Sequence, residues 1–185
     1  DDFSNAVPDD IFEKIVALIR VSAPYAGMIM STRESQSMRE RGLALGISQI
    51  SGGSRTSVGG YVEEEPEEEN SAQFDTSDRR SLDEIVEWLL QLGYVPSFCT
   101  ACYREGRTGD RFMALAKSGQ ISNCCQPNAL MTLKEYLLDY ADEETKAVGA
   151  AVIDVQLDSI KNDLVKEKSK AYIAQMEEGE RDFRF

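Results

Sequence analysis

The sequence contains no histidine. A Ser-His-Asp triad, a Cys-His dyad and an imidazole-ligated zinc site all require that side chain. Any chemistry carried out by this chain alone must therefore use thiolates, carboxylates, arginine, serine or tyrosine.

Positive charge and long apolar runs are also scarce. The 20 basic residues face 33 acidic ones, for a formal net charge of −13. Nucleic acids and anionic membranes bind basic surfaces, so neither is expected as a partner. No stretch approaches the roughly 20 apolar residues that cross a bilayer, and the N-terminal residues 1–4 do not resemble a signal peptide. We expect a soluble, intracellular protein that binds small molecules or other proteins.

Helical spacing alternates with short apolar runs in the first half of the chain. A helix is predicted over about 10–22, a buried strand at 27–30, a helix over about 34–45 and a second strand at 47–51. This rhythm is typical of an α/β fold with a parallel sheet. Two or three such units cannot close an eight-stranded barrel, so the chain is expected to continue a sheet that begins elsewhere.

The middle of the chain is polar and acidic. Six glutamates lie between Glu63 and Glu69, and we predict a mobile, solvated loop over about 61–80. A third helix is predicted from the N-cap candidate Ser81 to Gly93.

Beyond Pro96 the pattern becomes mainly helical. A short helix is predicted near 109–118, a turn at 125–128, and helices near 132–140 and 143–175, followed by a charged, exposed tail.

Four cysteines fall close together between positions 99 and 125. Cys99, Cys102 and Cys125 form a C-x2-C-x22-C arrangement, in which the first two can chelate one metal centre from a single turn. Three thiolates without histidine suit a [4Fe-4S] cluster that leaves one iron open.

The spacing leaves two other interpretations open. With Cys124 the thiols number four, which would satisfy a structural zinc site, although adjacent cysteines seldom both face one metal. Free or redox-paired thiols are the third possibility.

Three arginines, Arg104, Arg107 and Arg111, follow the C-x2-C pair. Such cations would lower thiol pKa values and offset a negative cluster. A salt-bridged, solvated helix start explains them equally well.

A second candidate site follows the two predicted strands. Ser31 and Arg33 come after the first, and Ser54 and Arg55 after the second. Parallel α/β folds bind ligands at such strand ends, and arginine there suits a carboxylate. An ion pair that ties the loops together is the structural alternative.

Several motifs together resemble the HydG family of [FeFe]-hydrogenase maturases, which is related to the tyrosine lyase of thiamine biosynthesis. The motifs are Cys99-Thr-Ala-Cys-Tyr-Arg-Glu-Gly-Arg-Thr-Gly-Asp-Arg-Phe-Met113, Cys125-Gln-Pro-Asn-Ala129, Glu135-Tyr-Leu-Leu-Asp-Tyr140, Met30-Ser-Thr-Arg-Glu34 and Ser48-Gln-Ile-Ser-Gly-Gly-Ser-Arg-Thr56. The resemblance covers nearly the whole chain.

The resemblance implies a fold and an activity. Residues 1–95 would supply the last units of a radical-SAM (β/α)8 TIM barrel, and residues 96–185 a helical domain that carries an auxiliary [4Fe-4S] cluster. The family is a lyase that cleaves tyrosine with a radical from S-adenosylmethionine. It releases p-cresol and makes carbon monoxide and cyanide, collected with cysteine on a fifth, dangling iron as a synthon for the hydrogenase H-cluster.

The resemblance also implies roles for individual residues. Cys99, Cys102 and Cys125 would hold the auxiliary cluster, with Cys124 a bystander. Arg55, and with it Ser54, Ser31 and Arg33, would bind the carboxylate of tyrosine or of S-adenosylmethionine.

One departure limits the activity. The family's C-x3-C-x2-C motif, which binds the second, radical-generating [4Fe-4S] cluster, is missing here, as is the histidine that the family lends to the dangling iron. We therefore expect the chain to be inactive by itself and to need the N-terminal barrel half. The implied partners are other hydrogenase maturation proteins, and the implied location is the cytoplasm, or an organelle in a eukaryote. A zinc-stabilised protein-interaction module without catalysis is the alternative function.

Overall fold

The structure is a computed structural model that describes residues 7–56 and 76–185. It forms two compact units, an N-terminal unit up to Leu82 and a C-terminal unit from Asp83 to Phe185. The described residues are mostly helical, with eight helices and one two-stranded sheet. None of these helices is long and apolar enough to span a membrane.

The N-terminal unit has the predicted helix–strand–helix–strand order, confirmed within two residues at most boundaries. Its elements are α1 (Asp9–Ser22), β1 (Ile29–Met30), α2 (Gln36–Ala44) and β2 (Gln49–Ile50). The strands are shorter than the predicted runs, and they pair in parallel with Met30 beside Ile50. The sequence rhythm therefore predicted the topology correctly.

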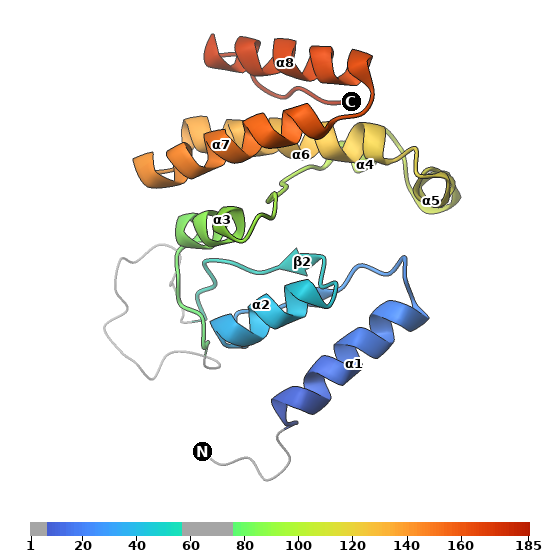
Figure 1. The fold of residues 1–185 in the computed structure, drawn as a ribbon, viewed down its shortest axis with the longest axis vertical. Coiled ribbons are helices and arrows are strands. Elements are labelled where there is room, and N and C mark those ends of the chain that lie inside the picture. Colours follow the sequence, from blue (N-terminus) through green and yellow to red (C-terminus); the bar gives the residue numbers. More distant parts are fainter. Residues whose placement is uncertain (1–6, 57–75) are drawn as a thin grey trace. The chain divides into compact units, whose positions relative to one another are not determined.

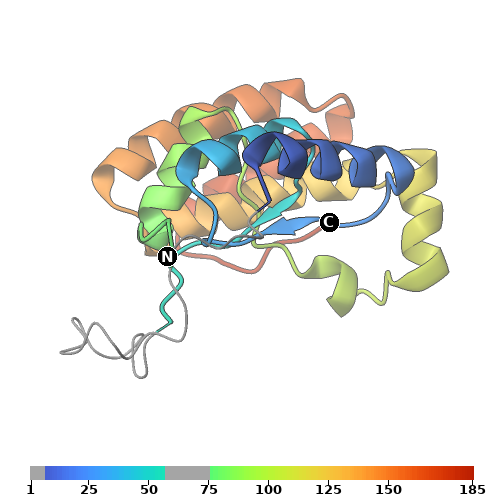
Figure 2. The ribbon, with the colours of Figure 1, turned by 90° about the horizontal axis from the view of Figure 1, so that it is seen from below.

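Both helices of this unit pack on one face of the two strands (Figure 2). Met30, almost fully buried, clusters with Val16 of α1, and its side chain also approaches Gly42 of α2. Ile29 points the other way and is 68% exposed. Since neighbouring strand residues face opposite sides of a sheet, Ile29 lies on the face opposite the helices, and none of the described helices of this unit covers that face.

A buried ion pair ties the unit together. Arg39 of α2 is completely buried and contacts the carboxylate of Asp78 as well as the carbonyl oxygen of Ser51. The main-chain N–H of Asp78 donates to the carbonyl oxygen of Thr32 at 3.0 Å. Because Ser51 directly follows β2 and Thr32 is the second residue after β1, this network holds both strand ends in place.

The C-terminal unit is a helical assembly around α6. Its elements are α3 (Leu82–Gln91), α4 (Ala101–Arg104), α5 (Gly109–Ser118), α6 (Ser122–Asp139), α7 (Glu143–Ser159) and α8 (Asp163–Glu177). Helix α6 lies against both α7 and α8 (Figure 1). Its Leu130, Met131 and Leu133 are at most 1% exposed and form the centre of the core.

Asp83 connects the start of α3 to two other helices. Its carboxylate accepts hydrogen bonds from the Tyr136 hydroxyl (2.8 Å), the Thr145 hydroxyl (3.0 Å) and the Asp142 N–H (3.1 Å). Burial first, and then this hydrogen bond, raise the pKa of Tyr136. Val86 and Leu90 of α3 belong to the same apolar core.

The division between the two compact units falls between Leu82 and Asp83, because the apolar side of α3 contributes to the C-terminal core. The predicted domain boundary at residue 95 stays a prediction.

Two predictions about helices in the C-terminal half were wrong. The predicted turn at 125–128 lies inside α6, where Pro127 is fully buried. Burial of this segment outweighs the hydrogen bond that proline cannot donate. The predicted helix over 143–175 is two helices, because Asn162 caps α8 by accepting from the Leu164 and Val165 N–H groups.

The prediction of an exposed chain end is partly confirmed. Residues 177–182 are exposed, but residues 183–185 are half-buried, and Phe183 stacks on Tyr172 at 4.3 Å between ring centroids. Most of the predicted mobile loop over 61–80 lies outside the described residues, but Asp78 near its end is buried.

Candidate functional site: the cysteine segment and the strand ends

The four cysteines come from two places in the C-terminal unit. Cys99 precedes α4 and Cys102 lies within it, whereas Cys124 and Cys125 lie in the first turn of α6. All four are free thiols. Helix α5 and its flanking turns connect the two places, so the 22-residue spacing is a helical excursion that returns to α6.

The thiols lie close enough to influence one another. Removal of the sulfur from water is the largest cause that raises the pKa of Cys125, although the residue as a whole is exposed. Cys102, Cys99 and Cys124 raise it further, and only Arg107 opposes them. Repulsion of this kind arises when several thiolates share one neighbourhood, and a bound cation relieves it.

Hydrogen-bond donors already point at two of the sulfurs. The Ala101 N–H donates to Cys99 Sγ at 3.4 Å, and Arg107 Nη1 donates to Cys124 Sγ at 3.3 Å. Hydrogen bonds to sulfur are one of the means by which proteins tune iron–sulfur clusters.

Of these two donors, Arg107 also contacts the C-terminal segment, which we define as residues 181–185. Its Nη2 donates to the carbonyl oxygen of Phe185 at 2.7 Å. Its Nε is buried and has no hydrogen-bond partner among the described residues. Buried donors of this kind are rare in native structures and call for an explanation.

The C-terminal segment is held against the cysteine region by further contacts. Arg104 of α4 pairs with both carboxylate oxygens of Asp182, and the Asp182 N–H donates to Glu135 at 2.5 Å. Asn128 of α6 bonds both main-chain groups of Phe185, accepting its N–H at 2.9 Å and donating to its carbonyl at 3.3 Å. The segment therefore links α4 to α6.

A cavity of about 130 Å³ opens between these elements. Cys99 and Thr100 line it from the cysteine segment, Asn128 and Glu135 from α6, and Asp182 from the C-terminal segment. Its lining is mixed polar and charged, which suits a small polar ligand better than an apolar one.

The donor set has the chemistry that a three-thiolate cluster requires. The sulfurs belong to one small region, and Cys124, whose sulfur accepts from Arg107, is adjacent to Cys125. Within the described ranges, no three Cys, Asp or Glu side chains converge as closely as a metal ion would need. The assignment of Cys99, Cys102 and Cys125 as ligands thus stays a prediction.

The second predicted site lies at the strand ends of the N-terminal unit. Ser31 and Arg33 are exposed just after β1, Ser54 is half-buried, and Arg55 is exposed after β2. The parallel register brings the two segments to the same sheet edge, and the Arg33 N–H donates to Ser31 Oγ at 3.2 Å. Their binding of a carboxylate stays a prediction.

Ser31 also borders a larger, mainly apolar cavity of about 400 Å³ in this unit. Phe12, Ile15 and Ile19 of α1 form one wall, and Ile29 contributes from β1. Ile15 and Ile19 remain more than 40% exposed.

The sequence analysis missed the groups that position both candidate sites. Nothing in the local pattern singled out Arg39 or Asp78, because their pairing joins positions 39 residues apart. Asn128 lay in the quoted Cys125–Ala129 motif, and aromatic Phe183 and Phe185 could have suggested that the chain end is anchored.

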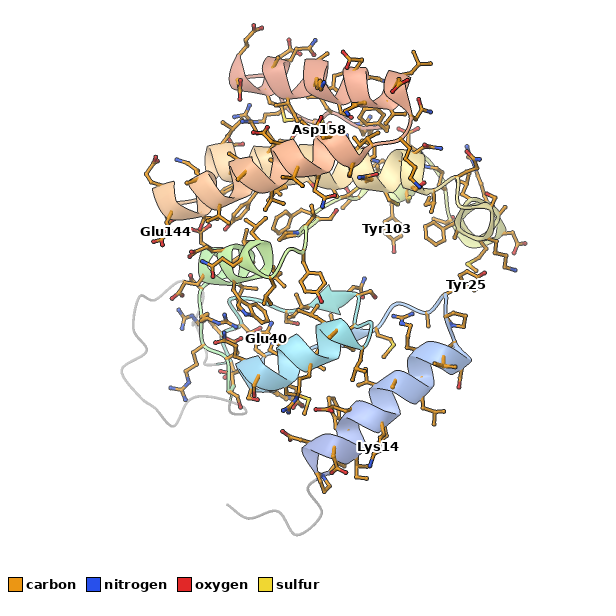
Figure 3. All side chains as sticks on the ribbon, viewed as in Figure 1. Lys14, Tyr25, Glu40, Tyr103, Glu144 and Asp158 are labelled. Atoms are coloured by element: carbon orange, nitrogen blue, oxygen red, sulfur yellow. The ribbon has the colours of Figure 1, made fainter. Side chains whose placement is uncertain are left out.

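The tyrosines of the C-terminal unit do not point to a radical relay. Tyr103 projects from α4 on the side away from α8 and is 82% exposed (Figure 3). Tyr136 stacks on Phe98 with ring centroids 5.1 Å apart, as a core residue does.

Comparisons with known proteins address the whole chain. The sequence model for the Biotin and Thiamin Synthesis associated domain matches residues 1–95. A crystal structure of HydG, a maturase of the [FeFe]-hydrogenase, matches with a TM-score of 0.91 and 52% identity over 99% of this chain and 39% of that one. HydG from Carboxydothermus hydrogenoformans matches with a TM-score of 0.65 and 37% identity over 92% of this chain and 35% of that one.

The chain spans less than two fifths of either maturase chain. A search of curated proteins found no match.

Proposed function

The chain belongs to the Biotin and Thiamin Synthesis associated domain family and resembles the C-terminal half of HydG. We propose on this basis that it is the auxiliary-cluster part of a HydG-type radical-SAM tyrosine lyase. The complete enzyme would bind tyrosine and S-adenosylmethionine. It would release p-cresol and deliver carbon monoxide and cyanide, bound with cysteine to iron, for assembly of the hydrogenase H-cluster.

The observation that carries this proposal is the shared neighbourhood of the thiols in a chain that resembles HydG over 99% of its length. Cys99, Cys102 and Cys125 would hold a [4Fe-4S] cluster. Such a cluster supplies an open iron to which the small ligands and a further iron, bridged by free cysteine, can be attached.

Residues around the thiols would support the proposed cluster and the small cavity beside it. The Ala101 N–H and Arg107 supply positive partial or full charge beside the sulfurs. Asn128 fixes the C-terminal segment, which lines the small cavity next to Cys99. A cavity lined by polar and charged groups suits a small polar ligand.

We further propose that residues 1–95 are the last units of the (β/α)8 barrel. Both helices lie on one face of β1 and β2, and the opposite face leaves Ile29 exposed, as expected for the inner face of an incomplete barrel. Barrel enzymes place their sites at the carboxyl ends of the strands. Ser31, Arg33, Ser54 and Arg55 lie there and would bind the carboxylate of tyrosine or S-adenosylmethionine.

By this proposal the chain is inactive alone, because it lacks the C-x3-C-x2-C motif for the second [4Fe-4S] cluster. It would act with the N-terminal barrel half and with other hydrogenase maturation proteins.

Anaerobic reconstitution with iron and sulfide, followed by metal analysis and EPR, tests the cluster. About four irons per chain and a reducible [4Fe-4S] signal are expected, and Cys102→Ala should lose both. Cys124→Ala is the matched control, since it removes a neighbouring thiol that the proposal does not use as a ligand, and it should keep the iron.

Bound zinc at one ion per chain, lost equally in both variants, would contradict the proposal. It would favour a zinc-stabilised interaction module, in which all four thiols are ligands.

A further inference from the structure

Arg107 joins two segments that are far apart in sequence. One guanidinium nitrogen donates to Cys124 Sγ at 3.3 Å and another to the Phe185 carbonyl at 2.7 Å. These partners lie 17 and 78 residues away. A long, flexible side chain with two such anchors is fixed in place, so its charge stays at one position beside the thiols.

The third guanidinium N–H group of Arg107 is unexplained by the chain itself. Its Nε is buried and finds no acceptor in residues 7–56 and 76–185. A buried donor without a partner costs free energy, and native structures usually reserve such a group for a bound molecule or a functional task. A cluster held by three thiolates brings sulfide and thiolate sulfurs, which are anionic acceptors.

The neighbouring arginines do not share this arrangement. Arg104 is exposed, and its charge is neutralised by the paired carboxylate of Asp182. Arg111 is exposed and donates to the Glu105 carbonyl at 3.4 Å. Of these three arginines, only Arg107 has a described contact with a sulfur.

We propose that Arg107 is a positioning residue of the cysteine site, which holds a fixed positive charge beside the cluster and thereby raises its reduction potential. This inference rests on the proposed cluster at Cys99, Cys102 and Cys125. Each one-electron reduction makes the cluster more negative by one charge, and a nearby cation stabilises the reduced state more than the oxidised one. Cys124 then has a role: its sulfur orients the guanidinium, and it is not a ligand.

The test is an EPR-monitored reductive titration with dithionite of the anaerobically reconstituted chain and of Arg107→Gln. The substitution removes the charge and, because glutamine is shorter, both anchors, while keeping a polar, uncharged side chain. The cluster in this variant should have a more negative midpoint potential, with iron and sulfide content close to that of the unaltered chain.

Arg104→Gln is the matched control. It removes the same formal charge from the same segment, together with a contact to the C-terminal segment, but touches no sulfur. Its potential should change by clearly less than that of Arg107→Gln. Equal shifts in the two variants, or no shift in Arg107→Gln, would overturn the role of Arg107.

Cys124→Ala provides a second measurement if Arg107→Gln fails to fold. It keeps the arginine and its charge but removes the sulfur anchor, so the potential should fall in the same direction by a smaller amount. An unchanged potential there would also count against the inference. If the unaltered chain takes up no cluster, the proposed function itself fails, and this role fails with it.

Discussion

The two compact units of this protein are stabilised in different ways. The N-terminal unit has a small apolar cluster around Met30, and its loops are tied by the completely buried Arg39 with Asp78. The C-terminal unit has a large apolar core centred on α6, and its ion pairs, such as that of Arg104 with Asp182, lie at the surface. A buried pair is specific but fails if one partner is lost, whereas an apolar core tolerates small losses.

The two kinds of stabilising contact hold different candidate site residues in place. The buried pair fixes Thr32, which lies between the predicted carboxylate-binding residues Ser31 and Arg33, and Ser51, which directly follows β2. The apolar core of the other unit makes α6 rigid, and α6 presents Cys125 and Asn128 from its first half. If each unit depends on its own kind of contact, single substitutions should affect the two units separately.

Asp78→Asn should have the largest effect. It leaves the buried Arg39 guanidinium without its counter-charge, which costs about 3–5 kcal/mol of stability in comparable buried pairs. Hydrogen exchange of the α2 amides measures the effect on the N-terminal unit. The fluorescence of Trp88, the single tryptophan, which lies in the C-terminal unit, should change little.

Asp9→Asn is the control for that substitution. Asp9 pairs with Arg41 at 2.8 Å on the surface, where such pairs contribute about 0–1 kcal/mol. If both variants lost the same stability, the buried pair would not be the feature that orders the N-terminal unit.

Asn128→Ala should release the C-terminal segment at a cost of about 1–3 kcal/mol, because the Phe185 N–H loses its acceptor and the Phe185 main-chain oxygen keeps only its hydrogen bond from Arg107. Hydrogen exchange of the Phe185 N–H and limited proteolysis of residues 181–185 would report the release. Gln126→Ala removes an amide from the same helix whose contact is with Ser159, and it should leave the segment protected. Unchanged protection in Asn128→Ala would show that the aromatic contacts alone suffice.

Gly149→Ala and Gly42→Ala compare the tightness of the two cores. A Cβ at position 149 would lie 2.5 Å from Leu137 Cδ1, and one at position 42 would lie 2.5 Å from Met30 Cε. Overpacking costs about 1–3 kcal/mol, partly offset by the gain of about 0.5–1 kcal/mol for alanine in a helix. The flexible end of Met30 can move aside, whereas branched Leu137 cannot do so easily.

We therefore expect Gly149→Ala to lose stability in chemical denaturation and Gly42→Ala to stay close to the unaltered chain. A larger loss of stability in Gly42→Ala than in Gly149→Ala would contradict the interpretation that the C-terminal core is packed more tightly around its glycine.

Acidification is the mildest perturbation. Burial acts to raise the pKa of Asp78, but the hydrogen bonds from Arg80 and the charge of Arg39 outweigh it, so the pKa lies below its ordinary value of 3.8. The carboxylate therefore contributes stability above about pH 4, and this contribution is lost as the pH falls through the folded-state pKa. Hydrogen exchange of α2 should accelerate there, and Asp78→Asn should remove that pH dependence.

Much of the local structure could be predicted from the sequence. Helical spacing in 10–22 and 109–118 located α1 and α5, and alternating helices and apolar runs predicted the parallel pairing of β1 and β2. These features depend on neighbours along the chain, which a periodic pattern records directly. The resemblance of the cysteine motif to HydG was likewise visible in the residues and is supported by the comparison at 52% identity.

Contacts between distant residues decided the remainder. Pro127 ends no helix, because its burial in the core outweighs its missing N–H group. Three other features also depend on contacts between distant residues. They are the pair of Arg39 with Asp78, the packing of α3 on the C-terminal core, and the contact of Phe185 with Arg107. Each contact is stabilised by the free energy released when segments far apart in the sequence pack together. The sequence pattern of one segment alone cannot predict this contact.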